Sequence, residues 1–257
     1  MSEERDPGDV PVLDTPDRPA HGVDRGDRLH EFRGESVSVT WSRKRCIHVA
    51  ACVMNLPRVF QPGRRPWIDV TRAPADAIAR VVGHCPTGAL HFERTDGGTP
   101  ESVPETNLAL VTRQGPIYLR GDIEVMDESG ALRLADTRVA VCRCGQSANK
   151  PLCDGAHLAT GFSDAGAISA GIEVQNTGES GGKLRVRPLQ DGPLEVEGPF
   201  ILASADRRTM LEASRARLCR CGRSQTKPFC DGSHKRLTSD PSASSAQRIG
   251  DVDGGVP

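Results

Sequence analysis

The sequence contains one sixteen-residue pattern twice, and both copies carry side chains that bind metals. Residues 142–157 read CRCGQSANKPLCDGAH and residues 219–234 read CRCGRSQTKPFCDGSH, so eleven of the sixteen positions are identical. Each copy places three thiols and one imidazole in a C-x-C-x8-C-x3-H frame, and both groups ligate zinc and iron–sulfur clusters. The pattern predicts two Cys3His sites with these ligands: Cys142, Cys144, Cys153 and His157 in the first, and Cys219, Cys221, Cys230 and His234 in the second.

A third group of cysteines precedes the repeat. Cys46 and Cys52 are separated by five residues, and Cys85 follows much later, directly before a proline. The nine cysteines thus divide into three sites of three, whereas an odd number is awkward for a disulfide framework. The spacing is half of a bacterial ferredoxin site, but Val49 stands where a further cysteine would complete it. A [3Fe–4S] cluster needs only the three cysteines, and a [4Fe–4S] cluster needs one more ligand.

Two histidines are candidates for that ligand. His48 lies between the first two cysteines and is the better placed, and His84, beside Cys85, is the second candidate. The alternative for either histidine is a hydrogen-bonding or packing role. The alternative for the whole site is a set of three buried structural thiols.

The elements that position the two repeated sites belong to a longer repeat. Cys142 and Cys219 are 77 residues apart, and residues 115–121 (GPIYLRG) align with residues 192–198 (GPLEVEG) at the same offset. Strand-like segments precede each site, at 108–113, 117–126 and 139–144, and again at 183–188, 194–203 and 216–221. We expect two β-rich domains, 106–163 and 183–237, that pack as an intramolecular pseudo-dimer with a pseudo-two-fold axis. Asp154 is expected to cap a helix whose first turn holds His157, one turn after Cys153.

The N-terminal part is organised differently. Residues 35–41 alternate like a strand, the apolar run after Cys46 can form a helical turn, a helix is expected over 75–82 behind Pro74, and a strand over 90–94. Residues 1–34 and 238–257 are rich in polar residues, proline and glycine, and are interpreted as a disordered arm and tail. The predicted fold class is α+β: a half-ferredoxin-like α/β module at 35–95, then two β-rich modules, all stabilised by metals.

The repeated pattern resembles the signature of the CDGSH (mitoNEET-type) iron–sulfur family, C-x-C-x2-[ST]-x3-P-x-C-D-G-[SAT]-H. Ser147 and Ser224 fill the hydroxyl position, and Pro151 and Pro228 fill the proline position. The resemblance implies one [2Fe–2S] cluster per motif, held by three cysteines and one histidine. The chain is similar to the soluble members with two motifs on one chain, and we expect no membrane anchor. From spacing alone, two structural zinc sites remain the alternative.

The segment 38–93 resembles the divergent mono-cluster [4Fe–4S] ferredoxin-type domain. It contains C-I-H-x3-C-V, P-x-V-F, R-P-W and C-P-T-G-A-L in that order. The resemblance implies one [4Fe–4S] or [3Fe–4S] cluster on Cys46, Cys52 and Cys85.

Composition narrows the functional class. Of 257 residues, 37% are hydrophobic and 4% aromatic, which is lean for one large core and fits small modules held together by metals. The formal net charge of −1 gives no support to nucleic-acid binding. The sequence has no apolar run of the ~18 residues that a membrane span needs, and its start does not resemble a signal peptide. We expect a soluble, cytoplasmic protein, in a reducing compartment where cysteine clusters bind metal.

Three functional hypotheses follow. The first is a non-enzymatic electron carrier that meets a redox partner protein. The second is cluster storage, cluster transfer to an apo-acceptor, or redox sensing through labile His-ligated clusters. The third is a zinc-stabilised interaction module. A monomer with internal pseudo-symmetry is expected in each case.

Other residues carry weaker indications. Two basic groups near the N-terminal site could dock an acidic partner or form a solvated charged face. Trp67 and Phe60 are expected in the core of the N-terminal module. Three histidines have no other candidate ligand or catalytic residue at a suitable spacing, and we assign them no role. The basic residues are Arg43, Lys44, Arg45, Arg64 and Arg65, and the histidines are His21, His30 and His91.

Overall fold

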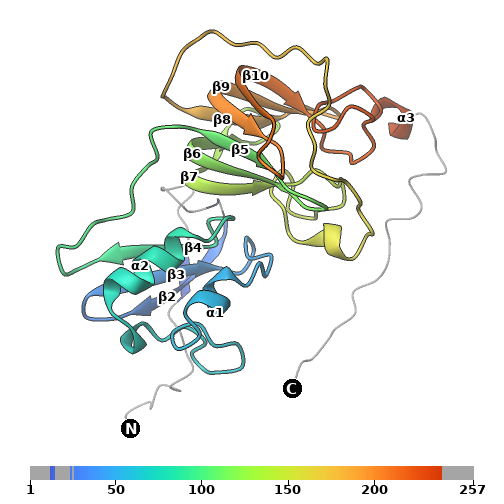
Figure 1. Ribbon diagram of the computed structural model, residues 1–257. Coiled ribbons are helices and arrows are strands. Elements are labelled where there is room, and N and C mark those ends of the chain that lie inside the picture. Colours follow the sequence, from blue (N-terminus) through green and yellow to red (C-terminus); the bar gives the residue numbers. More distant parts are fainter. Residues whose placement is uncertain (1–11, 15–23, 25, 239–257) are drawn as a thin grey trace.

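The computed structural model describes residues 12–14, 24 and 26–238 (Figure 1). The described chain is mostly β-structure with few helices, and its strands form two separate sheets. The N-terminal module lies on one side of the larger sheet, which is built from both repeats (Figure 1). No helix in the described part is long and apolar enough to cross a membrane.

The N-terminal sheet contains four antiparallel strands in the order β1-β2-β3-β4. The helix α2 packs against this sheet and buries Ile78, Val81 and Val82 in the module's core. Its start follows Pro74, whose fixed φ suits the beginning of a helix. Phe60 is fully buried and Trp67 packs beside it, as expected. The elements are β1 Val12–Asp14, β2 Arg28–Arg33, β3 Val37–Ser42, α1 Ala51–Asn55, η1 Val70–Arg72, α2 Ala75–Gly83 and β4 Leu90–Arg94.

One expectation for this module is wrong. Residues 28–33, assigned above to the disordered arm, form strand β2 and pair with β3. Leu29 and Phe32 are buried, but they are three residues apart, so the segment lacks the period-two alternation by which strands are detected. The short strand β1 also falls in the predicted arm. The remaining arm residues, except 24, 26–27 and 34, and residues 239–257 of the predicted tail lie outside the described residues.

The larger sheet is built from both repeats. Its strand order is β10-β9-β5-β6-β7, and β8 pairs with both β6 and β9. One hydrophobic core lies within it and draws on all six strands. The strands are β5 Leu108–Val111, β6 Ile117–Met126, β7 Leu132–Val141, β8 Leu184–Pro188, β9 Leu194–Ala203 and β10 Met210–Leu218.

The strand register repeats at the 77-residue offset. The pair Ala109↔Leu119 between β5 and β6 has its counterpart in Val186↔Val196 between β8 and β9. The cross-repeat pairs are reciprocal too, because β5 runs parallel to β9 and β8 runs parallel to β6. The first strand of each repeat therefore pairs with a strand of its own repeat and with a strand of the other. This pairing covers edges and apolar faces that one repeat alone would expose.

Candidate metal centres

The first repeated site gathers its ligands as two pairs. The sulfurs of Cys142 and Cys144 are 3.6 Å apart, and Cys153 Sγ lies 3.4 Å from His157 Nδ1. Two sulfurs on one tetrahedral metal, at bonds of about 2.3 Å, are separated by about 3.7 Å, and a sulfur and an imidazole nitrogen by about 3.5 Å. Each pair therefore has the spacing of two ligands on a single metal atom.

The second site repeats this geometry. Cys219 and Cys221 place their sulfurs 3.7 Å apart, and Cys230 Sγ lies 3.4 Å from His234 Nδ1. The residues predicted as ligands from the repeated pattern thus meet as one Cys–Cys pair and one Cys–His pair in each repeat. Among the described residues, no three or more His, Cys, Asp or Glu side chains are grouped so that they could hold a metal ion.

The loop around each centre is held by polar side chains that occur in both copies of the motif rather than by a helix. Asp154 accepts the backbone N–H of Ala148 (2.7 Å) through one oxygen and that of Ala156 (3.0 Å) through the other. Ser147 donates its hydroxyl to Leu152 O at 2.6 Å. In the second copy, Asp231 and Ser224 make the equivalent bonds to Gln225, Ser233 and Phe229. The two motifs are therefore built alike, bond for bond, at these positions.

The predicted helix at the first site is not formed. Gly155 is left-handed (φ 91°), and only a 3-10 turn, η2 Ala156–Leu158, follows it. In the second repeat the short helix α3 Lys235–Thr238 begins after His234. The aspartate closes its loop instead of capping an α-helix, and the left-handed glycine bends the chain so that the histidine still reaches the cysteine four residues earlier.

In each centre the environment favours the thiolate of the first cysteine and raises the pKa of the other two, through the neighbouring thiol and burial. The thiol of Cys144 and backbone N–H groups, including that of Ser147, donate to Cys142 and lower its pKa to about 6, although burial opposes the shift. The corresponding bonds from Cys221 and from backbone groups including Ser224 lower the pKa of Cys219 to about 5. These N–H groups are available to stabilise a metal-bound thiolate, and hydrogen bonds to cluster ligand sulfurs raise the potential of a cluster.

The two repeated centres adjoin each other through their turns. A Cβ added to Gly145 would lie 2.7 Å from Cys221 O, and one added to Gly222 would lie 2.6 Å from Cys144 O. Both glycines follow a ligand cysteine directly and have positive φ. The turn of each metal loop thus rests on a ligand of the other loop, and only glycine permits this approach.

The two centres differ in their exposure to solvent. All four ligands of the first centre are buried, His157 at 8% exposure, whereas of the second set only Cys219 is buried and His234 is half-buried. The difference arises because the N-terminal module covers the first centre. Ile47 packs against Ala140 and Cys153, and its Cβ lies 3.8 Å from a Cβ built on Gly155.

The predicted N-terminal ligands line one cavity of about 360 Å³. Cys46, Cys52, Cys85 and His48 all contribute to its wall, which is otherwise largely apolar. Burial, together with the two neighbouring thiols, raises the pKa of Cys52 to about 11, so it is a protonated thiol unless a metal binds it. The exposed His84 at the end of α2 is not part of the cavity wall, so the geometry favours His48 over it.

Two further observations fit an iron–sulfur cluster in this cavity. His48 and Ala50 are left-handed at φ 55° and 64°, and such alternating backbone turns direct N–H groups toward bound anions, Fe–S sites included. The indole N–H groups of Trp41 and Trp67 are buried and, among the described residues, have no hydrogen-bond partner. Both rings line the cavity, where cluster sulfides would accept these bonds.

Replacing Trp41 and Trp67 by phenylalanine is therefore expected to lower the reduction potential of the N-terminal cluster by tens of millivolts. Hydrogen bonds to cluster sulfur favour the more negative, reduced state, so removing them disfavours reduction. A redox titration followed by electron paramagnetic resonance measures the shift. The His-ligated clusters provide an internal control because their potentials should stay unchanged. An unshifted N-terminal potential in the double variant would show that neither indole bonds to the cluster.

A single tyrosine lies between the N-terminal cavity and the first repeated centre. Tyr118 is the only tyrosine in the sequence and packs against the group formed by Ile47, Ala140 and Cys153. Its burial, and the nearby thiols of Cys153 and Cys85, raise its pKa to about 12. The pKa of this one side chain responds to predicted ligands of both centres, so the two centres lie next to each other.

A buried network of charges fixes the N-terminal module against the first repeat. Arg45, 2% exposed, pairs with Asp136 at 2.5 Å and donates to Arg138 O at 2.8 Å. Arg138 in turn bonds Glu101 and the backbone carbonyls of residues 82, 85 and 90. His91 bridges Asp136 (3.1 Å) and Glu101 (3.0 Å). The network spans the loop of Cys85 and strand β7, which ends directly before Cys142.

Sequence reasoning missed this network. His91 received no role above, and Arg45 was assigned to a surface basic patch, which is wrong because its side chain is buried. Burial alone would lower the pKa of His91, but the charges and hydrogen bonds of Asp136 and Glu101 outweigh it and raise the pKa to about 9. Burial would raise the pKa of Asp136, but the positive charges of Arg45, His91 and Arg138 hold it far below its usual range. No spacing rule in the sequence links residues 45, 91 and 136.

Of the other weakly indicated residues, Arg43 and Arg65 are exposed, and Arg64, Lys44 and His30 have structural partners. Arg64 donates to the backbone carbonyls of residues 58, 59 and 66, so it holds a loop together. Lys44 lies 3.7 Å from the carboxylate of Asp24. The ring of His30 packs 5.3 Å from that of Trp41. His21 lies outside the described residues.

Comparisons with known proteins agree with this division of the chain. Residues 32–95 match the family described as a divergent 4Fe-4S mono-cluster, and residues 114–158 and 191–235 match the family described as an iron-binding zinc finger of CDGSH type. A protein of Escherichia coli K12 described as "Uncharacterized protein YjdI" is 30% identical over 61 residues, which are 24% of this chain and 80% of that protein. Its counterpart in Escherichia coli O157:H7 matches equally. No solved structure matches the chain.

The matched segments contain all three groups of ligands described above. The N-terminal match includes Cys46, Cys52 and Cys85, and each CDGSH match includes three cysteines and one histidine. The chain therefore belongs to the iron–sulfur proteins in which a divergent 4Fe-4S mono-cluster domain precedes two CDGSH-type iron-binding domains.

Proposed function

We propose that this protein is an electron carrier with three clusters in series. Each repeated centre would hold one [2Fe–2S] cluster, and the N-terminal cavity one [4Fe–4S] or [3Fe–4S] cluster. When bound, each cluster would accept and release one electron. The protein would act as a carrier rather than as an enzyme, as a cytoplasmic monomer whose repeats replace the two subunits of a dimer.

The observation that carries this proposal is the continuous contact between the three centres. Ile47, next to the ligand Cys46, packs on the ligand Cys153 of the first repeated centre. Gly145 of that centre rests on the ligand Cys221 of the next. The order along this path is N-terminal cavity, first centre, second centre. Side-by-side clusters allow an electron to enter at one end and leave at the other, and the rigid network around Arg45 would keep the first step fixed.

The ligand geometry supports the proposed cluster types. Two ligand pairs per repeated centre suit a binuclear cluster, which places one pair on each iron. A neutral imidazole in place of one thiolate makes the cluster less negative and raises its potential above that of an all-cysteine cluster. In the N-terminal cavity, His48 is the proposed fourth ligand if the cluster is [4Fe–4S].

Anaerobic purification with metal analysis tests the proposal. We expect a red-brown protein with roughly seven irons per chain for a [3Fe–4S] cluster or roughly eight for a [4Fe–4S] cluster, with matching sulfide. Voltammetry should then show reversible reduction with the clusters intact. A colourless protein containing stoichiometric zinc and no sulfide would refute the proposal and leave a zinc-stabilised interaction module.

The exposure of the second centre favours one other candidate function, cluster donation. His234 and two of the three cysteines of this centre are partly open to solvent, so an acceptor could reach them. Incubation with an apo-ferredoxin separates the two functions. A donor loses iron to the acceptor, whereas a carrier retains its iron while it exchanges electrons.

A further inference from the structure

We propose that the surface around the second CDGSH centre docks an acidic electron-transfer protein. This surface, called the second-centre rim below, is formed by four basic residues and adjoins Cys230 and His234. The inference rests on the proposed function and names the class of the partner. The rim residues are Arg217, Arg223, Lys235 and Arg236.

The internal repeat shows how the equivalent surface is used in the first half. There, Ala140 and Cys153 are covered by Ile47, so a module with its own cluster site docks directly on the first centre. At the 77-residue offset, Ala140 corresponds to Arg217 and Cys153 to Cys230. The chain thus already uses this face of a CDGSH centre as the docking site for a redox module.

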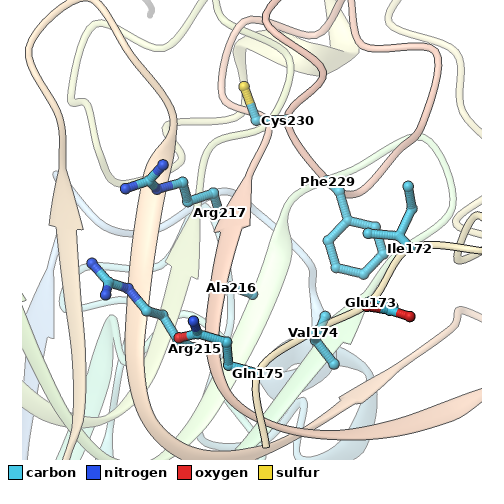
Figure 2. Close-up of a pocket in the computed structure, with 9 residues that line it drawn as sticks. All are labelled: Ile172, Glu173, Val174, Gln175, Arg215, Ala216, Arg217, Phe229 and Cys230. Atoms are coloured by element: carbon cyan, nitrogen blue, oxygen red, sulfur yellow. The ribbon is translucent and has the colours of Figure 1, made fainter.

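The equivalent face of the second repeat is open close to the ligands. A cavity of about 340 Å³ lies there, lined by Arg217, Phe229 and Cys230 among others (Figure 2). The side chain of Arg217 is 61% exposed, whereas that of its counterpart Ala140 is buried. Gln175 of the preceding segment pairs with Arg215 and covers the part of strand β10 farther from the ligands. Ser169 of the same segment donates to Lys227 O, whereas Arg217, which lines the cavity with Cys230, stays exposed.

The charge of this face points to the class of partner. Residues 138–159 contain three basic residues and one acidic residue, whereas the equivalent residues 215–236 contain seven basic and one acidic. The four additional cations are the rim residues, which replace Ala140, Gln146, Leu158 and Ala159 of the first repeat. Of the four first-repeat positions, only Ala140 is covered by the N-terminal module, and Gln146, Leu158 and Ala159 are exposed but uncharged. The equivalent surface of the second repeat is therefore more basic by four charges.

Acidic residues also lie at this face, and Glu173 belongs to the cavity wall. Glu195, almost fully buried, pairs with Arg187 and Arg215 and lies 3.5 Å from Arg217. It replaces Tyr118 of the first repeat, so it anchors guanidinium groups where the first repeat packs its N-terminal module. Figure 2 shows the side chains of Arg215 and Arg217 projecting on the same side of β10, with the sulfur of Cys230 beyond Arg217. A basic rim beside an exposed redox centre steers acidic partners toward it.

The test gives three of the four rim positions the residue found in the first repeat. The variant Arg217→Ala, Arg223→Gln, Arg236→Ala removes three charges, and the control Arg80→Ala, Arg207→Ala, Arg208→Ala removes three exposed charges elsewhere. The probe is an acidic [2Fe–2S] ferredoxin, and its affinity for the cluster-loaded protein is measured by calorimetry at low and at high salt. We expect the rim variant to bind at least tenfold more weakly at low salt with a reduced salt dependence, and the control to change less than twofold.

Three outcomes would overturn the inference. In the first, the rim variant binds the ferredoxin as tightly as the wild type does. In the second, the control variant loses as much affinity as the rim variant. In the third, the wild type binds a basic cytochrome c as tightly as it binds the acidic ferredoxin. Voltammetry of the same samples tests the proposed function separately. Reversible cycling without charge-dependent binding refutes only the docking surface. Charge-dependent binding without reversible cycling refutes the carrier function, and with it the identification of the partner as an electron-transfer protein.

Discussion

Replacing Asp136 by alanine is expected to destabilise the protein by about 3–5 kcal/mol and to loosen the N-terminal module from the first repeat. Asp136 is fully buried and pairs with Arg45 and His91, so its removal leaves cations buried without their counter-charge. For a chain of this size the midpoint of thermal unfolding should fall by about 10 °C. Loss of the visible cluster absorption on heating, with denaturant unfolding, measures the effect.

Arg208→Ala is the matched control, because Arg208 and Asp206 are 4.0 Å apart and both are largely exposed. Its effect should stay below about 0.5 kcal/mol. The network also predicts a pH dependence. Because the pKa of His91 rises to about 9 in the folded protein, its stabilisation is complete below its unfolded pKa of about 6.5 and disappears as the pH rises through 9. A melting temperature unaffected by Asp136→Ala would show that the network does not hold the modules together.

Replacing His234 by cysteine is expected to slow the loss of iron to a chelator at least tenfold and to lower the potential of that cluster by on the order of 100 mV or more. The second centre is the exposed one, so it should account for the fast phase of iron loss in the wild type. A thiolate in place of the imidazole binds iron more tightly and adds a negative charge, which disfavours reduction. Stopped-flow measurement of chelated iron and a redox titration provide the two readouts.

His157→Cys is the matched comparison, because the same substitution then falls in the buried centre. It should leave the fast phase unchanged while lowering the potential of the first cluster, since His157 is only 8% exposed beneath the N-terminal module. If His157→Cys abolished the fast phase instead, the assignment of the labile centre to the second repeat would be wrong. If both substitutions left the kinetics unchanged, exposure would not control cluster loss.

Much of the site follows from the sequence because its determinants are local. Cysteines separated by one residue, and a cysteine and a histidine four residues apart, lie within one loop, so their spacing alone restricts which atoms can meet. The strands β6 and β9 coincide with the predicted segments 117–126 and 194–203, since alternating apolar residues mark buried strand faces. The 77-residue offset anticipated the equivalence of the repeats, and with it the matching Cys–Cys and Cys–His pairs of the two CDGSH motifs.

The tertiary structure decided what depends on contacts between distant residues. The partners Arg45 and Asp136 are 91 positions apart, and only the packing of one module on the other excludes water and makes their charges a pair. The same packing buries His157 and leaves His234 accessible, although their motifs are nearly identical. The η2 turn replaced the expected helix because Asp154 bonds across its own loop, an option that local helix signals do not reveal. The sequence by itself thus determined the ligands, whereas burial and neighbouring charges, which belong to the folded chain, made two similar centres different.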